Sequence, residues 1–162
     1  MDRRVLALIV SAVLLGVVVV VVLVGRGGGD SSSSGDLTDT SQKPVVEVPD
    51  DPPPDQLEVK DIVEGDGAEA KKGDQVSVQY VGVDYGTGKE IGSSWDGNQP
   101  VDFQLGSGQV IPGWDQGVEG MKVGGRRELT VPPDLAYGPA GRPPDIPPNA
   151  TLVFVIDLLS VK

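Results

Sequence analysis

The chain has 162 residues and a formal net charge of −11, and it contains neither cysteine nor histidine. Without cysteine there is no disulfide, thiolate metal site or thiol nucleophile, and without histidine there is no Ser-His-Asp triad and no histidine general base. The acidic balance argues against a nucleic-acid partner, which would require a basic patch. Any chemistry must therefore come from carboxylates, hydroxyls, backbone amides or the shape of an apolar pocket.

The first predicted element is an apolar segment of 20 consecutive uncharged residues, 5–24. As a helix it would span about 30 Å, the thickness of the hydrocarbon core of a bilayer. Two arginines precede it, so residues 1–24 are predicted to be a cytoplasmic tip and a single transmembrane anchor, with the rest of the chain outside the cytoplasm. The alternatives are a cleaved signal peptide, for which residues 24–26 are a poor cleavage site, and a buried core helix, for which the segment lacks a polar face.

A polar segment, residues 25–56, follows the apolar one. It is rich in Gly, Ser, Asp and Pro and carries a net charge of −5. Because such a segment buries too little apolar surface to offset the entropy of ordering, it is predicted to be a disordered linker. A flexible chain of this length typically reaches roughly 30 Å. Val45, Val46 and Val48 could pair transiently with the folded domain, although no motif indicates it.

The remaining residues, 57–162, are enough for one globular domain. Val76, Val78 and Tyr80 alternate with polar residues, which predicts a half-buried antiparallel strand. Strand-like patterns occur at residues 57–63, 75–83, 89–94, 101–105, 126–131 and 151–161. From these patterns we expect four or five antiparallel strands.

One soluble helix is predicted at residues 110–120, where Trp114, Val118 and Met121 have helical spacing. Residues 132–149 form a long loop with seven prolines, which indicates either a functional loop or a rigid cover over a sheet edge. The predicted fold class is α+β, with the helix against one face of an antiparallel sheet.

The seven aromatic residues admit two interpretations. They could simply belong to the core, or they could line one apolar cup of the kind that binds ligands. The sequence pattern by itself does not decide between these two. The aromatic residues are Tyr80, Tyr85, Trp95, Phe103, Trp114, Tyr137 and Phe154.

A series of motifs follows along the domain. They are Val-Gln-Tyr-Val-Gly at 78–82, Ser-Ser at 93–94, Pro-Val-Asp-Phe-Gln-Leu-Gly at 100–106, Gln-Val-Ile-Pro-Gly-Trp-Asp-Gln-Gly-Val at 109–118, Met-Lys-Val-Gly at 121–124, Leu-Thr-Val-Pro-Pro-Asp-Leu-Ala-Tyr-Gly at 129–138 and Ile-Pro-Pro-Asn-Ala-Thr-Leu-Val-Phe at 146–154. In this order and spacing they resemble the FKBP-type peptidyl-prolyl cis-trans isomerases. The resemblance covers about residues 58–162, and the apolar segment before it suggests a membrane-anchored, bacterial member.

The resemblance implies a half-open antiparallel β-sheet wrapped around one short α-helix, with an aromatic pocket between them that holds a prolyl residue. Trp114 would be the floor of that pocket, and the Tyr137 hydroxyl and the Ile111 N–H would bind substrate carbonyls. No cofactor and no metal is implied. The catalytic residues implied are Tyr80, Phe103, Trp114, Tyr137 and Phe154, and the substrate-binding residues implied are Ile91, Val101, Val110, Ile111 and Ile146.

Four positions depart from the family's usual pattern. Gly92 stands where an Asp usually meets the pocket tyrosine, and Gly97 stands where its Arg partner is common. Ile91 replaces a Phe, and Arg142 replaces a frequent His. We therefore expect reduced affinity for the macrolide inhibitors typical of the family, unless Asp96 takes over the role of the missing carboxylate.

The function implied is peptidyl-prolyl isomerisation that assists protein folding outside the cytoplasm, by a monomer acting on proline-containing polypeptides. It requires no nucleophile and no acid–base pair, which suits a chain without His or Cys. One alternative is a tethered peptide-binding chaperone or adaptor with little turnover. Another is a purely structural tethered domain.

Overall fold

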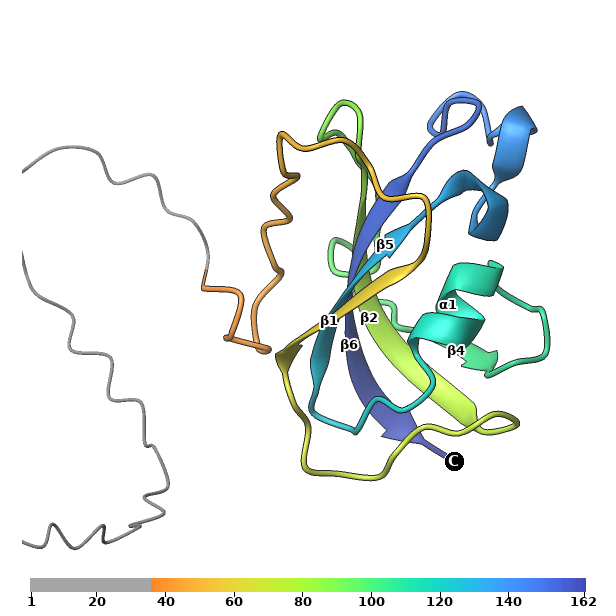
Figure 1. Ribbon diagram of the computed structural model, residues 1–162. Coiled ribbons are helices and arrows are strands. Elements are labelled where there is room, and N and C mark those ends of the chain that lie inside the picture. Colours follow the sequence, from red (N-terminus) through yellow and green to blue (C-terminus); the bar gives the residue numbers. More distant parts are fainter. Residues whose placement is uncertain (1–35) are drawn as a thin grey trace, which may run out of the picture. The chain divides into compact units, whose positions relative to one another are not determined.

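The computed structural model describes residues 36–162 (Figure 1). The predicted transmembrane anchor and the first part of the predicted linker lie outside the described residues. Within residues 36–162, no helix is long and apolar enough to cross a membrane.

The domain is built on a six-stranded sheet in which every pairing is antiparallel, with strand order β1-β5-β6-β2-β3 and with β4 also pairing β2. The strands are β1 (Glu58–Val63), β2 (Gln75–Asp84), β3 (Glu90–Ser93), β4 (Val101–Gln104), β5 (Arg126–Val131) and β6 (Leu152–Val161). The antiparallel sheet is confirmed, but the described residues form six strands and not four or five. The reason is that the long strand β2 pairs with β4 along its first half and with β3 along its second half.

The one α-helix among residues 36–162, α1 (Pro112–Gly117), is shorter than the predicted segment 110–120. Its first residue is a proline. Proline has no backbone N–H, and the N–H of a first helical residue has no partner within the helix in any case. The helix ends early because the chain turns at Gly120, which has a φ of 87° and donates from its N–H to the Ala70 carbonyl at 2.8 Å. The long loop contains two short 3-10 turns, η1 (Pro133–Leu135) and η2 (Gly138–Ala140).

Helix α1 lies against one face of the sheet, which we call the inner face (Figure 1). Two glycines allow this close approach. A Cβ atom on Gly113 would lie 2.4 Å from a Val131 methyl group, and one on Gly117 would lie 2.6 Å from a Leu129 methyl group. The helix backbone therefore rests directly on β5, and Trp114 projects from it into the core, where it is 6% exposed.

The opposite, outer face of the sheet is also covered. Residues 36–56, which we call the strap, lie along this face in Figure 1, on the side away from α1. Val81, Val83, Val153 and Val155 belong to the outer face of β2 and β6, yet none is more than 4% exposed. Strand β2, predicted to be half-buried, is therefore buried on both faces over its second half.

A buried ion pair joins the strap to the sheet. Arg126 of β5 lies opposite Asp157 of β6, and its Nε and Nη2 donate to the two carboxylate oxygens at 2.6 and 2.7 Å. Two further guanidinium hydrogens go to the strap, with Nη1 donating to the Leu37 carbonyl at 3.0 Å and Nη2 to the Gln42 carbonyl at 2.9 Å. Burial raises the pKa of Asp157, and the Arg126 guanidinium offsets part of that rise.

The interpretation of residues 25–56 as a disordered linker therefore differs from the structure over 36–56. Lys43 forms ion pairs with Glu90 and Asp96, at 3.1 and 2.8 Å, and the Tyr85 hydroxyl donates to the Asp51 carbonyl at 3.0 Å. The strap has few apolar side chains of its own. It is ordered because its backbone carbonyls complete the bonding of a buried guanidinium and because it covers apolar side chains that belong to the sheet.

We expect Arg126→Ala to lower the free energy of unfolding by about 3–5 kcal/mol, because the Asp157 carboxylate would remain buried without a partner. Urea denaturation followed by tryptophan fluorescence measures this loss. The matched double variant Arg126→Met, Asp157→Leu removes both charges and should recover most of it. A loss of less than about 1 kcal/mol in the single variant would contradict this account of the outer face.

Candidate functional site

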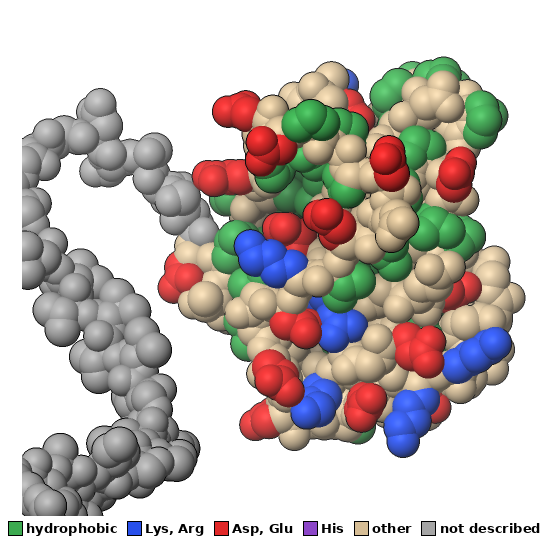
Figure 2. Space-filling model, viewed as in Figure 1, with side chains coloured by type: hydrophobic (Ala, Val, Ile, Leu, Met, Phe, Trp, Pro, Cys, Tyr) green, Lys and Arg blue, Asp and Glu red, His purple; other side chains and the backbone are tan. Residues whose placement is uncertain are grey.

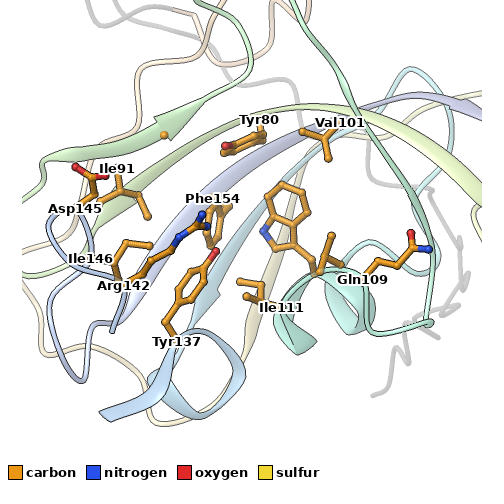
Figure 3. A pocket seen from close by; sticks show the side chains of 13 residues that line it. Tyr80, Ile91, Val101, Gln109, Ile111, Tyr137, Arg142, Asp145, Ile146 and Phe154 are labelled. Atoms are coloured by element: carbon orange, nitrogen blue, oxygen red, sulfur yellow. The ribbon is translucent and has the colours of Figure 1, made fainter. Parts of the chain in front are cut away.

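A cavity of about 420 Å³ opens between α1, the inner face of the sheet and the loop of residues 132–149 (Figure 3). On the face seen in Figure 2, hydrophobic side chains gather over the end of the molecule that this proline-rich loop forms. The cavity is lined by Tyr80, Ile91, Gly92, Val101, Gln109, Val110, Ile111, Trp114, Tyr137, Arg142, Asp145, Ile146 and Phe154.

Nine of the ten residues singled out from the sequence line this one cavity. They come from five separated parts of the chain: β2, β3 with β4, α1 with the residues before it, the long loop, and β6. The exception is Phe103, which is 2% exposed and packs against Trp114 from within the core, with 5.9 Å between the ring centroids. Phe103 therefore supports the pocket floor without lining it, and the roles of all ten in catalysis stay predictions.

The floor of the cavity is an aromatic cluster centred on Trp114. Its ring centroid lies 5.0 Å from that of Tyr80 and 5.4 Å from that of Phe154, and both pairs are close to edge-to-face. This geometry is favourable because the positive edge of one ring meets the negative face of the other. The aromatic residues can be interpreted either as core residues or as the lining of an apolar cup. Trp114 and Phe154 are both, since they are buried in the core and also line the cup.

Gly82 makes room for this cluster. A Cβ atom at Gly82 would lie 2.7 Å from the Phe154 ring, so a larger residue would displace that ring from the floor. The packing of the Phe154 ring therefore requires a glycine at the last position of the Val-Gln-Tyr-Val-Gly motif.

Several hydrogen-bond donors face or border the cavity without a partner among residues 36–162. They include the Tyr80 hydroxyl, the Tyr137 hydroxyl, the Trp114 indole N–H and the N–H of Ile111, the residue just before α1. Burial raises the pKa of the Tyr80 phenol, so this hydroxyl stays protonated at neutral pH and keeps its hydrogen to donate. An apolar cavity with a few convergent donors is the usual form of a site that binds a peptide or small molecule.

Gly92 places no side chain on the wall beside Tyr80. A Cβ atom there would lie 3.1 Å from the Tyr80 hydroxyl, a tight contact to which the tyrosine would have to yield slightly, and a carboxylate at this position would reach the hydroxyl. Asp96 does not replace that carboxylate, because it bonds to Lys43 of the strap at 2.8 Å. Gly97 faces open space, since a Cβ atom there would meet only the Gln99 side chain, at 3.9 Å.

Sequence reasoning missed two lining residues, Gln109 and Asp145, and considered Arg142 only for its charge. Gln109 precedes the predicted Val110, and Asp145 precedes the predicted Ile146. The available signal was therefore their place next to predicted residues, Gln109 as the first residue of one motif and Asp145 just before another. Gln109 is held at the rim because its Oε1 accepts a hydrogen bond from the Gln104 N–H at 2.9 Å. In the part of the chain that the structure describes, no group of three or more carboxylates could hold a metal ion.

Comparison with known proteins identifies close relatives. Residues 67–159 match the family described as FKBP-type peptidyl-prolyl cis-trans isomerase. The chain is 56% identical over 121 residues to the FK506-binding protein of Streptomyces anulatus, covering 74% of this chain and 98% of that protein. It is 51% identical over 119 residues to the probable FK506-binding protein of Corynebacterium glutamicum, with the same coverage. The crystal structure of AtFKBP13 has a TM-score of 0.60 and 39% identity, covering 65% of this chain and 93% of that one.

The similarity to the two bacterial proteins reaches beyond the predicted domain. Residues 57–162 number 106, so matches of 121 and 119 residues necessarily include part of the sequence before residue 57. Part of the segment that precedes β1 is therefore shared with these relatives.

We expect the Gly92→Asp variant to be more stable than the Gly92→Ala variant, with a free energy of unfolding about 0.5–1.5 kcal/mol higher. The reason is that the Asp carboxylate would accept a hydrogen bond from the Tyr80 hydroxyl. Urea denaturation of the two variants gives the difference. Both add the same Cβ atom beside Tyr80, so the comparison isolates the carboxylate. Equal stability would mean that the Tyr80 hydroxyl does not turn to this wall.

Proposed function

We propose a function for this chain on the premise that it belongs to the family of FKBP-type peptidyl-prolyl cis-trans isomerases. It is a peptidyl-prolyl cis-trans isomerase, and we propose that it assists protein folding outside the cytoplasm. The observation that best supports this function is the aromatic cup, in which the rings of Tyr80, Trp114 and Phe154 meet beneath hydrogen-bond donors that have no partner among residues 36–162.

The reaction suits the chemistry of this pocket. An X–Pro amide isomerises slowly because rotation about its C–N bond has a barrier of about 18–20 kcal/mol. Rotation neither makes nor breaks a bond to carbon, so no nucleophile and no proton transfer are needed. The planar amide is dipolar through resonance, and the twisted amide is less so. A pocket with apolar walls therefore stabilises the twisted form relative to the planar one.

The lining residues have separate roles in this mechanism. The prolyl ring packs on Trp114, between Tyr80 and Phe154, and this contact supplies binding energy that offsets the strain of the twisted amide. The Tyr137 hydroxyl and the Ile111 N–H donate to carbonyls of the bound chain and hold it in a turn. A hydroxyl contact of this kind supplies about 1–2 kcal/mol, which is one part of the total.

The second candidate function is a peptide-binding chaperone or adaptor with little turnover. Gly92 favours it, because the wall beside Tyr80 is open where a carboxylate would otherwise fix the tyrosine. A purely structural domain would have no need of a 420 Å³ cavity with free donors. Measured turnover separates the two remaining functions.

The experiment is isomerisation of a Leu-Pro peptide by residues 36–162, which keep the strap in place. We expect Tyr137→Phe to lower kcat/KM about 5- to 30-fold, which corresponds to the loss of about 1–2 kcal/mol of transition-state stabilisation. Tyr85→Phe is the matched control, since its hydroxyl bonds to the Asp51 carbonyl outside the pocket. A folded protein that binds the peptide without accelerating its isomerisation would favour the chaperone function.

The partners follow from the pocket. We infer that proline-containing polypeptides are the substrates and that the domain acts as a monomer. The family also binds FK506-like macrolides. The unfilled wall at Gly92 supports weaker macrolide binding here than in members with a carboxylate at that position.

We further propose that the chain is anchored in a bacterial membrane by residues 5–24, with the isomerase domain outside the cytoplasm. The support is the length of the apolar segment and the two arginines before it. The bacterial sources of both compared relatives are consistent with this origin. Because the strap packs from residue 36 onward, the 11 residues 25–35 allow at most about 40 Å between anchor and domain.

Fractionation of bacterial cells that express the full chain tests this placement. We expect it in the membrane fraction, with the domain digested by protease added to intact spheroplasts. Deletion of residues 1–24 should release the domain into the soluble cytoplasmic fraction. Recovery of a shortened chain from the medium would instead support a cleaved signal peptide, and protection from protease would overturn the orientation.

A further inference from the structure

A positively charged residue that lines the cavity has no role in the mechanism above. Arg142 lies in the long loop, where its backbone is fixed by two hydrogen bonds with Ile146, at 2.8 and 3.0 Å. Its guanidinium carbon is 6.0 Å from the centroid of the Tyr137 ring, a distance at which a cation and an aromatic face attract each other. The cation is therefore held at the rim beside the residue that binds the substrate carbonyl.

The Arg142 guanidinium is available to a ligand. Among residues 36–162 it has no ion-pair partner and no side-chain hydrogen bond, whereas Arg126 and Arg127 each make four hydrogen bonds. A guanidinium presents five donors in a planar fork that matches the two oxygens of a carboxylate. Its preferred partner at this site is thus an acidic group brought by the substrate.

The other charged lining residue is Asp145, three residues further along the same loop. In the view of Figure 3 its carboxylate lies on the Ile91 side of the cavity, whereas the Arg142 guanidinium points toward Tyr137 and Phe154. The positive charge therefore lies next to the Tyr137 ring, the residue that binds the substrate carbonyl in the proposed mechanism.

We propose that Arg142 determines specificity by binding an acidic side chain directly before the substrate proline. This proposal rests on the isomerase activity. The prolyl ring fills the cup, so the nearest free side chain of the reacting X–Pro unit is that of X. The net charge of −11 repels acidic peptides at long range. Selectivity must therefore come from a contact shorter than the Debye length, about 8 Å at physiological salt.

The test compares Glu-Pro and Gln-Pro peptides, which have nearly the same shape and differ in charge. We expect residues 36–162 to favour Glu-Pro in kcat/KM by about three- to fivefold, the range that a partly exposed ion pair supports. Arg142→Gln should bring this ratio to about one, and Arg142→Lys should retain part of it. Because the readout is a ratio, any loss common to both peptides cancels.

Two controls sharpen the test. Lys60→Gln removes the same charge from the exposed edge strand β1, outside the cavity, and should leave the ratio unchanged. Asp145→Asn should raise the ratio, because it removes the competing negative charge at the rim. In about 1 M salt, where the Debye length is about 3 Å, the preference of the parent protein should shrink.

Equal turnover of the two peptides by the parent protein, or a ratio that survives Arg142→Gln, would overturn the proposal and leave the isomerase function intact. Acceleration of neither peptide would overturn the isomerase function together with this inference. The two failures are therefore distinguishable in one experiment.

Discussion

Helix α1 contacts the sheet through two glycines, Gly113 against Val131 and Gly117 against Leu129. With so little between them, the helix backbone comes close enough to β5 for Trp114 to reach the aromatic rings of β2 and β6. Everything the site does depends on this approach. A side chain at either glycine would force the helix outward, and overpacking of this kind typically costs about 1–3 kcal/mol. The floor of the cavity would then separate from its walls.

The same constraint explains why so small a helix supports a functional site. A helix of six residues has almost no stability of its own, since nucleation is unfavourable and few hydrogen bonds follow it. Its position is set by the packing of Trp114 and Val118 in the core, where the two are 6% and 0% exposed. The Ile111 N–H just before the helix is consequently held at a fixed place beside the floor. In the proposed mechanism, the floor and this donor are therefore in place before a substrate binds, so they need no reorganisation during the reaction.

Sequence reasoning predicted the inner half of this molecule much better than the outer half. Alternation of apolar and polar residues at 75–83 predicted β2. Nine of the ten site residues that the family resemblance implied line one cavity. The strap was missed for a physical reason. Its bonds to Arg126 come from the carbonyls of Leu37 and Gln42, and any residue type supplies a carbonyl. Those carbonyls are needed only because β5 pairs with β6 and buries Arg126 beside Asp157. This contact joins residues far apart in the sequence, so the composition of residues 36–56 does not predict it.

The strap and the cavity meet at β3. Lys43 bonds to Glu90 and Asp96, which lie on either side of Ile91 and Gly92, the two residues of β3 that line the cavity. Each of these partly exposed ion pairs contributes only about 0.2–1 kcal/mol, too little to decide the stability of the fold. Their effect is local, because β3 is an edge strand and, in the part of the chain that the structure describes, its one partner strand is β2. Glycine at 92 removes both a side chain and a carboxylate from this wall. Lys43 links Glu90, the first residue of β3, to Asp96 in the turn that follows the strand, and so ties the wall at Gly92 to the strap.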